Sequence, residues 1–309
     1  MIINATGIVI DHYGDVLMIE RDDTRTLAPP GGAAEIGELP TETVAREVKE
    51  ETGLIVMPVR LVGLYYLPTQ PNDYLSLSFR CIMRGGEIST SDESPRAGFF
   101  KTNPYPRPML ALHKEQIQNS LVHQGGPPYW GTHSLPTRLR LGNILLNRVI
   151  YPWIHFRRRR RGLPPYQPPP RWKAHVSTIF RDERGHVLWT KSKDQEEWIL
   201  PGDVSMPNEP PWGTAVRSVK NAHQINMRLT GLSGIYPAAD SATIALTFVA
   251  GFTSGQPLLI NGTETDFFAV GQEPRSARHQ HVIQVEDALN TAEEIHFRLM
   301  IPRSIVPNS

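Results

Sequence analysis

The sequence of 309 residues has one cysteine, Cys81, and no long run of apolar residues. A lone cysteine cannot form an internal disulfide, which argues against a disulfide-stabilised secreted domain. No window reaches about 18 apolar residues without charge, as a membrane-spanning helix requires. Residues 1–15 also lack the basic and then apolar pattern of a signal peptide. We therefore expect a cytoplasmic protein.

Acidic residues are missing from the stretch between His123 and Lys173. Its cations are Arg138, Arg140, Arg148, Arg157 to Arg161, Arg171 and Lys173, although the net charge of the whole chain is only +1. Residues 162–170 are rich in proline, which favours an extended, semi-rigid spacer. The segment 123–172 is thus predicted to be a basic, Pro-rich linker with a possible helix. Its part 138–173 could instead contact anionic lipid or nucleic acid, but we favour a connector.

An internal repeat becomes visible when the sequence is laid over itself so that Thr6 meets Ser177. Residues 6–65 then lie over residues 177–236 without a gap, and the matched pairs include Asp11 with Asp182, Glu38 with Glu209, Thr43 with Thr214, and Arg46 with Arg217. Such self-similarity indicates duplication of one fold. We predict domains at 1–122 and 173–296, the linker 123–172 between them, and a tail at 297–309.

Within each half the pattern predicts strands alternating with helices. In the first half we expect strands at 6–10, 16–20, 59–66 and 75–83, a Gly-rich loop at 29–32, and helices from Thr41 to Gly53 and at 113–121. The combination predicts two tandem α/β/α sandwich domains with mixed β-sheets. His113-x3-Ile117 is echoed by His279-x3-Ile283, which suggests a packing role for this histidine.

Three of the four carboxylates of the first predicted helix, Glu47, Glu50 and Glu51, lie close together in the sequence. Their spacing of i, i+3 and i+4 places them on one helix face, where they repel one another unless a divalent cation compensates them. Oxygen ligands alone suit Mg²⁺, or Mn²⁺ as a substitute, rather than Zn²⁺. Arg46 stands beside them and can orient one carboxylate through a bidentate pair. A solvated acidic helix face is the plainer alternative, but it does not explain Arg46 and the flanking glycines.

Residues Gly32 to Leu54 read GAAEIGELPTETVAREVKEETGL. This segment resembles the box of the Nudix hydrolases, G-x5-E-x7-R-E-U-x-E-E-x-G-U, where U is a bulky aliphatic residue, and every fixed position matches. The resemblance implies Glu50 and Glu51 as principal metal ligands, Glu47 as a ligand or water-positioning base, Arg46 as its orienting partner, Glu38 as a supporting acid, Gly31 as a carbonyl ligand, and Glu93 as a further acid from a loop.

The second copy lacks the carboxylates of the box. In the alignment of the repeat, Ser218, Asn221 and Ala222 replace the three glutamates, although Glu209 and Arg217 survive. We therefore expect the second domain to be catalytically inactive. Because Nudix proteins often pair, it could serve as an intramolecular pseudo-dimer partner; a homodimer of the whole chain is the alternative.

The resemblance implies a Mg²⁺-dependent hydrolase that cleaves the pyrophosphate of a nucleoside diphosphate linked to another moiety, with ADP-ribose-like compounds as the first guess. Cleavage of a nucleoside triphosphate, including an oxidised one, is a neighbouring possibility. A regulator that senses a nucleotide without turning it over belongs to a different class. The intact carboxylates favour the enzyme.

Overall fold

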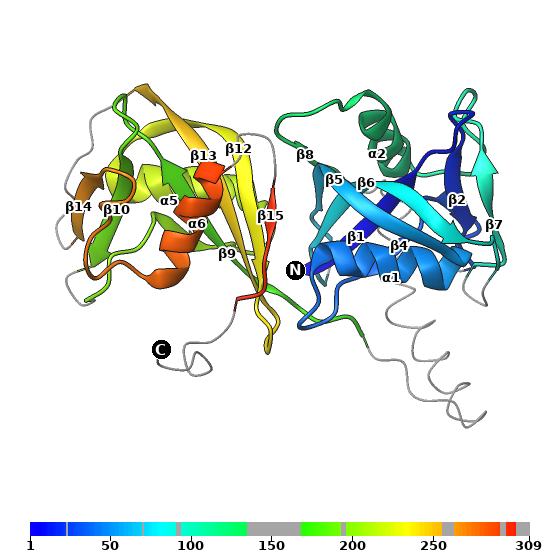
Figure 1. Ribbon diagram of the computed structural model, residues 1–309, viewed down its shortest axis with the longest axis horizontal. Helices are drawn as coiled ribbons and strands as arrows, with labels where there is room; N and C mark the ends of the chain where they lie inside the picture. Colours follow the sequence, from blue (N-terminus) through cyan, green and yellow to red (C-terminus); the bar gives the residue numbers. More distant parts are fainter. Residues whose placement is uncertain are drawn as a thin grey trace.

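The computed structural model describes residues 1–22, 24–69, 71–90, 94–134, 168–192, 196–254, 263–290 and 295–300. It consists of two α/β halves that lie side by side, the first at the right of Figure 1 and the second at the left. The predicted site residue Glu93 and the run Arg157 to Arg161 fall outside the described residues. In the described part of the chain, every helix is too short or too polar to span a membrane.

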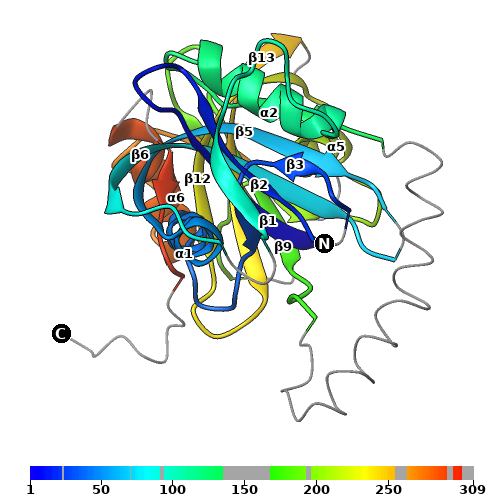
Figure 2. The same cartoon turned by 90° about the vertical axis from the view of Figure 1, so that its right-hand side faces the viewer.

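The first half is built around a mixed five-stranded sheet in the order β4-β1-β6-β5-β8. Its strands are β1 (Ile2–Val9), β4 (Gly31–Ala33), β5 (Leu54–Leu67), β6 (Tyr74–Gly86) and β8 (Tyr129–Thr132). A smaller sheet joins β3 (Leu27–Ala28), β2 (Val16–Glu20) and β7 (Arg96–Phe100). The helices α1 (Pro40–Thr52) and α2 (Ala111–Val122) cover opposite sides of the main sheet, with α2 above it and α1 below it in both Figure 1 and Figure 2.

The second half repeats this arrangement. Its five-stranded sheet has the corresponding order, β11-β9-β13-β12-β15, and β10 pairs with β14. The bounds of its elements are β9 (Lys173–Phe180), β10 (Val187–Ser192), β11 (Gly202–Val204), α5 (Pro211–His223), β12 (Asn226–Pro237), β13 (Thr243–Ser254), β14 (Thr263–Phe268), α6 (His279–Asn290) and β15 (His296–Phe297). Helices α1 and α5 both have 13 residues, and their first residues, Pro40 and Pro211, are a matched pair of the sequence repeat.

The structure differs from the sequence-based expectation at three places. The expected Gly-rich loop contains a strand, β4, because Gly31 and Gly32 pair with β1. β8 lies within the expected linker and pairs with β5, so the first sheet extends to Thr132. The counterpart of His113 is His281 rather than His279, since α2 begins at Ala111 and α6 at His279, and each histidine is the third residue of its helix.

A tyrosine fixes the second helix of each half to the main sheet. Asn119 Nδ2 in α2 donates a hydrogen bond of 2.8 Å to the hydroxyl of Tyr65 in β5. In the second half the Tyr236 hydroxyl donates to Asp287 in α6 at 3.1 Å. Each tyrosine ring lies over a glycine two residues earlier, where an added Cβ would come within 2.7 Å of Tyr65 in the first half. Both halves thus position their second helix by the same device.

The two halves contact each other through reciprocal pairs. Met1 and Trp172, which occupy matched positions of the repeat, exchange two backbone hydrogen bonds of 2.8 and 3.0 Å. Trp130 of β8 packs edge-on against Phe248 of β13, with ring centroids 6.1 Å apart. The corresponding Phe297 of β15 packs against Phe79 of β6 at 5.4 Å. Residues of both halves form one hydrophobic cluster. Such reciprocity is the mark of a contact around a two-fold axis.

Candidate active site

The acidic motif lies on α1, whose ends are set by local sequence. Pro40 occupies the first turn, where its missing N–H costs nothing, and Glu42 accepts a hydrogen bond of 2.8 Å from the Leu39 N–H. Gly53 ends the helix in the left-handed conformation, with φ of 75°. Valines Val44 and Val48 are buried against the sheet. The opposite side of the helix therefore carries the charged residues.

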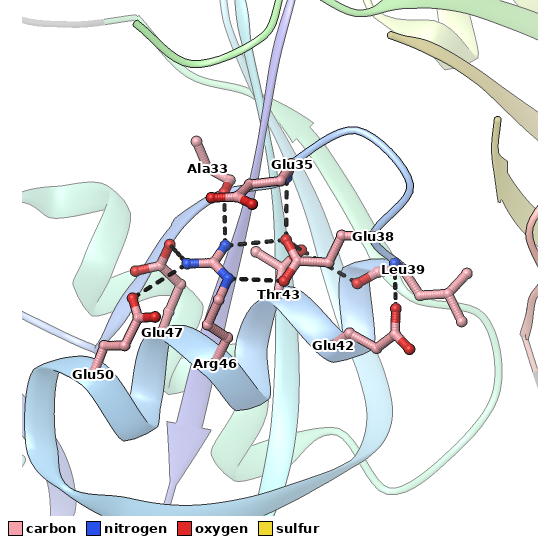
Figure 3. Close-up of polar contacts among 9 residues, drawn as sticks. All are labelled: Ala33, Glu35, Glu38, Leu39, Glu42, Thr43, Arg46, Glu47 and Glu50. Atoms are coloured by element: carbon pink, nitrogen blue, oxygen red, sulfur yellow. Dashed lines mark hydrogen bonds and ion pairs between the residues drawn. The ribbon is translucent and has the colours of Figure 1, made fainter. Parts of the chain in front are cut away.

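Arg46 is the centre of a network of carboxylates on this side of α1 (Figure 3). Its guanidinium donates to both oxygens of Glu38 at 2.8 and 3.0 Å, a bidentate pair. It also donates to Glu47 at 2.7 Å, to Glu50 at 3.4 Å and to the carbonyl of Ala33 at 3.1 Å. The hydrogen bond with Glu38 is the main cause that raises the pKa of Arg46, which is therefore permanently charged.

Glu38 holds Arg46 in place from the loop before α1. Burial favours the neutral acid, but hydrogen bonds from Arg46, the Glu35 N–H and Thr43 together outweigh burial and lower the pKa of Glu38. The Thr43 hydroxyl donates to Glu38 at 2.9 Å. Sequence reasoning assigned no role in the site to Thr43 or to the Ala33 carbonyl. The recurrence of Thr43 as Thr214 in the second copy was the signal for the former.

The side chain of Glu47 is only 15% exposed, against 61% for Glu50, and Gly32 makes room for it. A Cβ added to Gly32 would lie 2.3 Å from Glu47 Oε1. Burial raises the pKa of Glu47, while the charge and hydrogen bond of Arg46 oppose that rise. The Gly32 backbone and Arg46 thus confine one carboxylate between β4 and α1, as its expected role requires.

Glu50 and Glu51 flank Glu47 on the same face. The Gly31 N–H donates to Glu51 Oε2 at 2.9 Å, so Glu51 and the Gly31 backbone lie together. Glu50 is 61% exposed and reaches Arg46 through a long contact of 3.4 Å. Within the described ranges, no three acidic, His or Cys side chains converge as they do around a bound metal. The donor set of three carboxylates beside Gly31 nevertheless fits Mg²⁺ by its chemistry.

The second half retains the arginine network without the trio. Arg217 donates to Glu209 at 2.6 and 3.0 Å, as Arg46 does to Glu38. Asp203, at the position of Gly32, supplies the further carboxylate at 2.7 Å that Glu47 supplies in the first half. Ser218, at the position of Glu47, instead donates within its own helix. The arginine network therefore serves the fold in both halves.

The structure thus brings Gly31, Glu38, Arg46, Glu47, Glu50 and Glu51 together between β4 and α1. Of the predicted site residues, only Glu93 has no described position. A helix face of carboxylates, an orienting arginine and a close glycine backbone define a phosphohydrolase-type site on an α/β/α sandwich.

Comparison with known proteins agrees with this class. The NUDIX domain family matches residues 2–114. A MutT-like protein of Streptomyces ambofaciens is 33% identical over 42% of this chain and 82% of its own. The ADP-ribose pyrophosphatase of Methanocaldococcus jannaschii is 37% identical over 35% of this chain and 66% of its own. The 8-oxo-dGDP phosphatase of Mus musculus is 30% identical over 42% of each chain. The chain belongs to the NUDIX family, and it is a pyrophosphohydrolase of that family.

Proposed function

We propose that the first half hydrolyses the pyrophosphate linkage of a nucleoside diphosphate joined to another moiety, with ADP-ribose-like compounds as the first candidates. The arrangement of Glu47, Glu50 and Glu51 around Arg46 and the Gly31 backbone carries this proposal. The similarity to the ADP-ribose pyrophosphatase of Methanocaldococcus jannaschii supports the choice of substrate class.

Within this site the chain's own residues have separable tasks. Glu50 and Glu51, with the carbonyl of Gly31, would hold Mg²⁺, for which Mn²⁺ can substitute. The bound cation would neutralise the diphosphate, polarise a phosphorus and activate the attacking water. Glu47 would join these ligands or position the attacking water, and Arg46 fixes the Glu47 carboxylate. Glu38 holds the Arg46 guanidinium in position through two hydrogen bonds. We retain Glu93 as a further acid on the strength of its sequence position.

Nucleoside triphosphates, including oxidised ones, are the second candidate substrates. The similarity to the 8-oxo-dGDP phosphatase of Mus musculus supports oxidised nucleotides. A nucleotide-sensing regulator without turnover is the contrasting hypothesis, and the intact trio argues against it. For the compartment we propose the cytoplasm, since the single cysteine, Cys81, is free and cannot form an internal disulfide.

We further propose that the second half is catalytically inactive and acts as a built-in partner of the first, in a pseudo-dimer. The reciprocal contacts of Trp130 with Phe248 and of Phe297 with Phe79 support this role. Full activity of residues 1–122 as a separate monomer would contradict it. Contact of the segment 138–173 with lipid or nucleic acid stays a prediction from sequence.

Turnover of a nucleotide panel tests the enzyme. ADP-ribose, nucleoside triphosphates and 8-oxo nucleotides would each be incubated with the full chain and Mg²⁺. We expect Glu51→Gln to lower kcat about 100-fold or more. Ser218→Ala, which changes the counterpart of Glu47 in the second half, is expected to leave turnover unchanged. Tight nucleotide binding with no turnover of any compound would instead support the sensor.

A further inference from the structure

An open surface cavity of about 790 Å³ lies on the second half, beside the helix that has lost the catalytic carboxylates. It is lined by α5 and β12 together with Trp130, which comes from β8 of the first half. Its volume falls in the range of small-molecule sites, roughly 300–1,000 Å³. The cavity therefore spans the contact between the halves and borders the part of α5 that corresponds to the acidic face of α1, with which it shares only Arg217 and Asn221.

The charge of this cavity is opposite to that of the acidic site. In the alignment of the repeat, Gly213 replaces Glu42 and Asn221 replaces Glu50, so two acids are lost. Arg228 replaces Met57, so one cation is gained. None of the residues that line the cavity is acidic. One of these three changes, Glu50 to Asn221, removes a metal-binding carboxylate, and together the three make the surface around the cavity positive.

Two of its cations have no partner among the residues that the structure describes. Arg217 forms ion pairs with Glu209 and Asp203, which neutralise its charge. Lys220 and Arg228, by contrast, are exposed and form no ion pair with any described residue. Unpaired cations beside a cavity favour an anion, above all a phosphate. Direct binding of phosphate by cations needs no bridging metal ion.

Two indole rings provide the apolar wall of the cavity. Trp130 is oriented by its edge-on contact with Phe248, at an interplanar angle of 88°. Trp212 is oriented in the same way by Tyr66 of the first half, with centroids 6.3 Å apart at 82°. Both indoles are partly exposed. Oriented aromatic surfaces beside cations are the means by which proteins bind a base and its phosphates.

We propose that this cavity binds a nucleoside diphosphate or triphosphate without a divalent cation, with the base on Trp130 or Trp212 and the phosphates at Lys220 and Arg228. The ligand would contact both halves at once, because Trp130 belongs to the first. The degenerate copy thereby becomes a second nucleotide site, distinct from the acidic site on α1. This goes beyond the proposed hydrolysis and does not depend on it.

Calorimetric titration of the full chain with ADP in EDTA tests the proposal. We expect one binding site per chain, and at least a tenfold weaker Kd in the double variant Lys220→Gln/Arg228→Gln. The matched control is Lys49→Gln, the counterpart of Lys220 in the first half, which is expected to bind ADP as the unaltered chain does. Both sets of substitutions concern exposed side chains, so circular dichroism should confirm that all variants are folded.

Three outcomes would overturn the assignment. They are no heat of binding in EDTA, equal affinity in the unaltered chain and the double variant, or binding of inorganic pyrophosphate as tight as that of ADP. The last would show that the indoles take no part. Glu51→Gln separates this proposal from the hydrolase, because it should abolish turnover and leave ADP binding in EDTA intact. Loss of that binding in Glu51→Gln would place the ligand at α1 instead.

Discussion

Gly32 illustrates how a residue without a side chain can determine the position of a candidate catalytic side chain, that of Glu47. The three atoms nearest to an added Cβ all belong to the carboxylate end of the Glu47 side chain, which would have to shift. Gly32→Ala should therefore change the free energy of unfolding by less than about 0.5 kcal/mol but lower kcat about tenfold or more, because Glu47 is displaced. Gly85→Ala, where the added atom meets nothing within 4 Å, is the control for turnover. Equal activity of the two variants would contradict the proposed role of Glu47.

Arg46 and Arg217 form a matched pair with the same geometry and different expected importance. Replacement of either by Lys removes the bidentate pair with Glu38 or Glu209, and we expect each to cost about 1–2 kcal/mol in urea unfolding. Only Arg46→Lys should also lower kcat, since it alone orients Glu47. Equal loss of activity in Arg217→Lys would show that the second half contributes to chemistry.

At the level of single residues the sequence predicts identities better than side-chain positions. The spacing of Glu47, Glu50 and Glu51 requires a common helix face, and the structure has it. The repeat also separates Arg46, retained as Arg217, from the trio. Spacing cannot say that Glu50 turns to Arg46 while Glu51 meets the Gly31 N–H, because rotamers follow from contacts across the chain.

Helices α1 and α5 end on different residues, and this difference provides a test at the level of the secondary-structure element. Gly53 ends α1 at φ of 75°, and an added Cβ would lie 2.4 Å from the Glu87 carbonyl oxygen. Gly53→Ala should cost about 1–2 kcal/mol of unfolding free energy. In α5 the same position is Gln224, at φ of 55°. Gln224→Gly should be neutral or stabilise by up to about 1 kcal/mol. A loss of stability from Gln224→Gly in thermal unfolding would contradict this account.

Helix α6 gives the protein a predictable sensitivity to acid. The Leu200 N–H donates to His281 Nδ1 at 2.8 Å, so the folded ring is neutral. Burial, aided by the charges of Arg278 and His175 and opposed by Glu197, lowers the pKa of His281 to about 3. When the pH falls below the ordinary histidine pKa of about 6.5, the ring of His281 is protonated in the unfolded chain but stays neutral in the folded protein.

Stability should therefore fall as the pH drops from about 6.5 toward 3, by about 1.4 kcal/mol per pH unit from this group. His281→Asn keeps an acceptor for the Leu200 N–H and cannot titrate in this range. We expect its free energy of unfolding, measured in urea between pH 4 and 6.5, to depend less steeply on pH. An unchanged slope would rule out His281 as the source.

Elements with a strong local pattern were predictable, and elements defined by pairing were not. The helix from Thr41 to Gly53 has a starting proline, periodic valines and a final glycine, and it agrees with α1 to within one residue. Strand β4 consists of two glycines and an alanine, and it exists because β1 offers it an edge. The counterpart of His113 was missed because loop lengths differ between the copies, so the alignment that holds at α1 and α5 has shifted at α2 and α6.

At the scale of the whole molecule, the shared hydrophobic cluster predicts that the halves unfold together. Phe297→Ala removes one ring from the contact with Phe79, and we expect a loss of about 2–3 kcal/mol. Leu299→Ala, at an exposed side chain, is the control. Tryptophan fluorescence and circular dichroism in urea should follow one transition in both variants. Two separate transitions would show that the halves are independent units.

The reciprocal contacts around Met1 and Trp172 also bear on how such a chain can evolve. In a dimer of identical subunits every mutation occurs twice, so neither active site can be altered without the other. Fusion of the two copies removes this coupling while the contact surface is kept. The two sides of the contact have already diverged. Trp130 packs against Phe248 on one side of the axis, whereas Phe297 packs against Phe79 on the other. One copy can then change its chemistry while the other copy keeps the original active site.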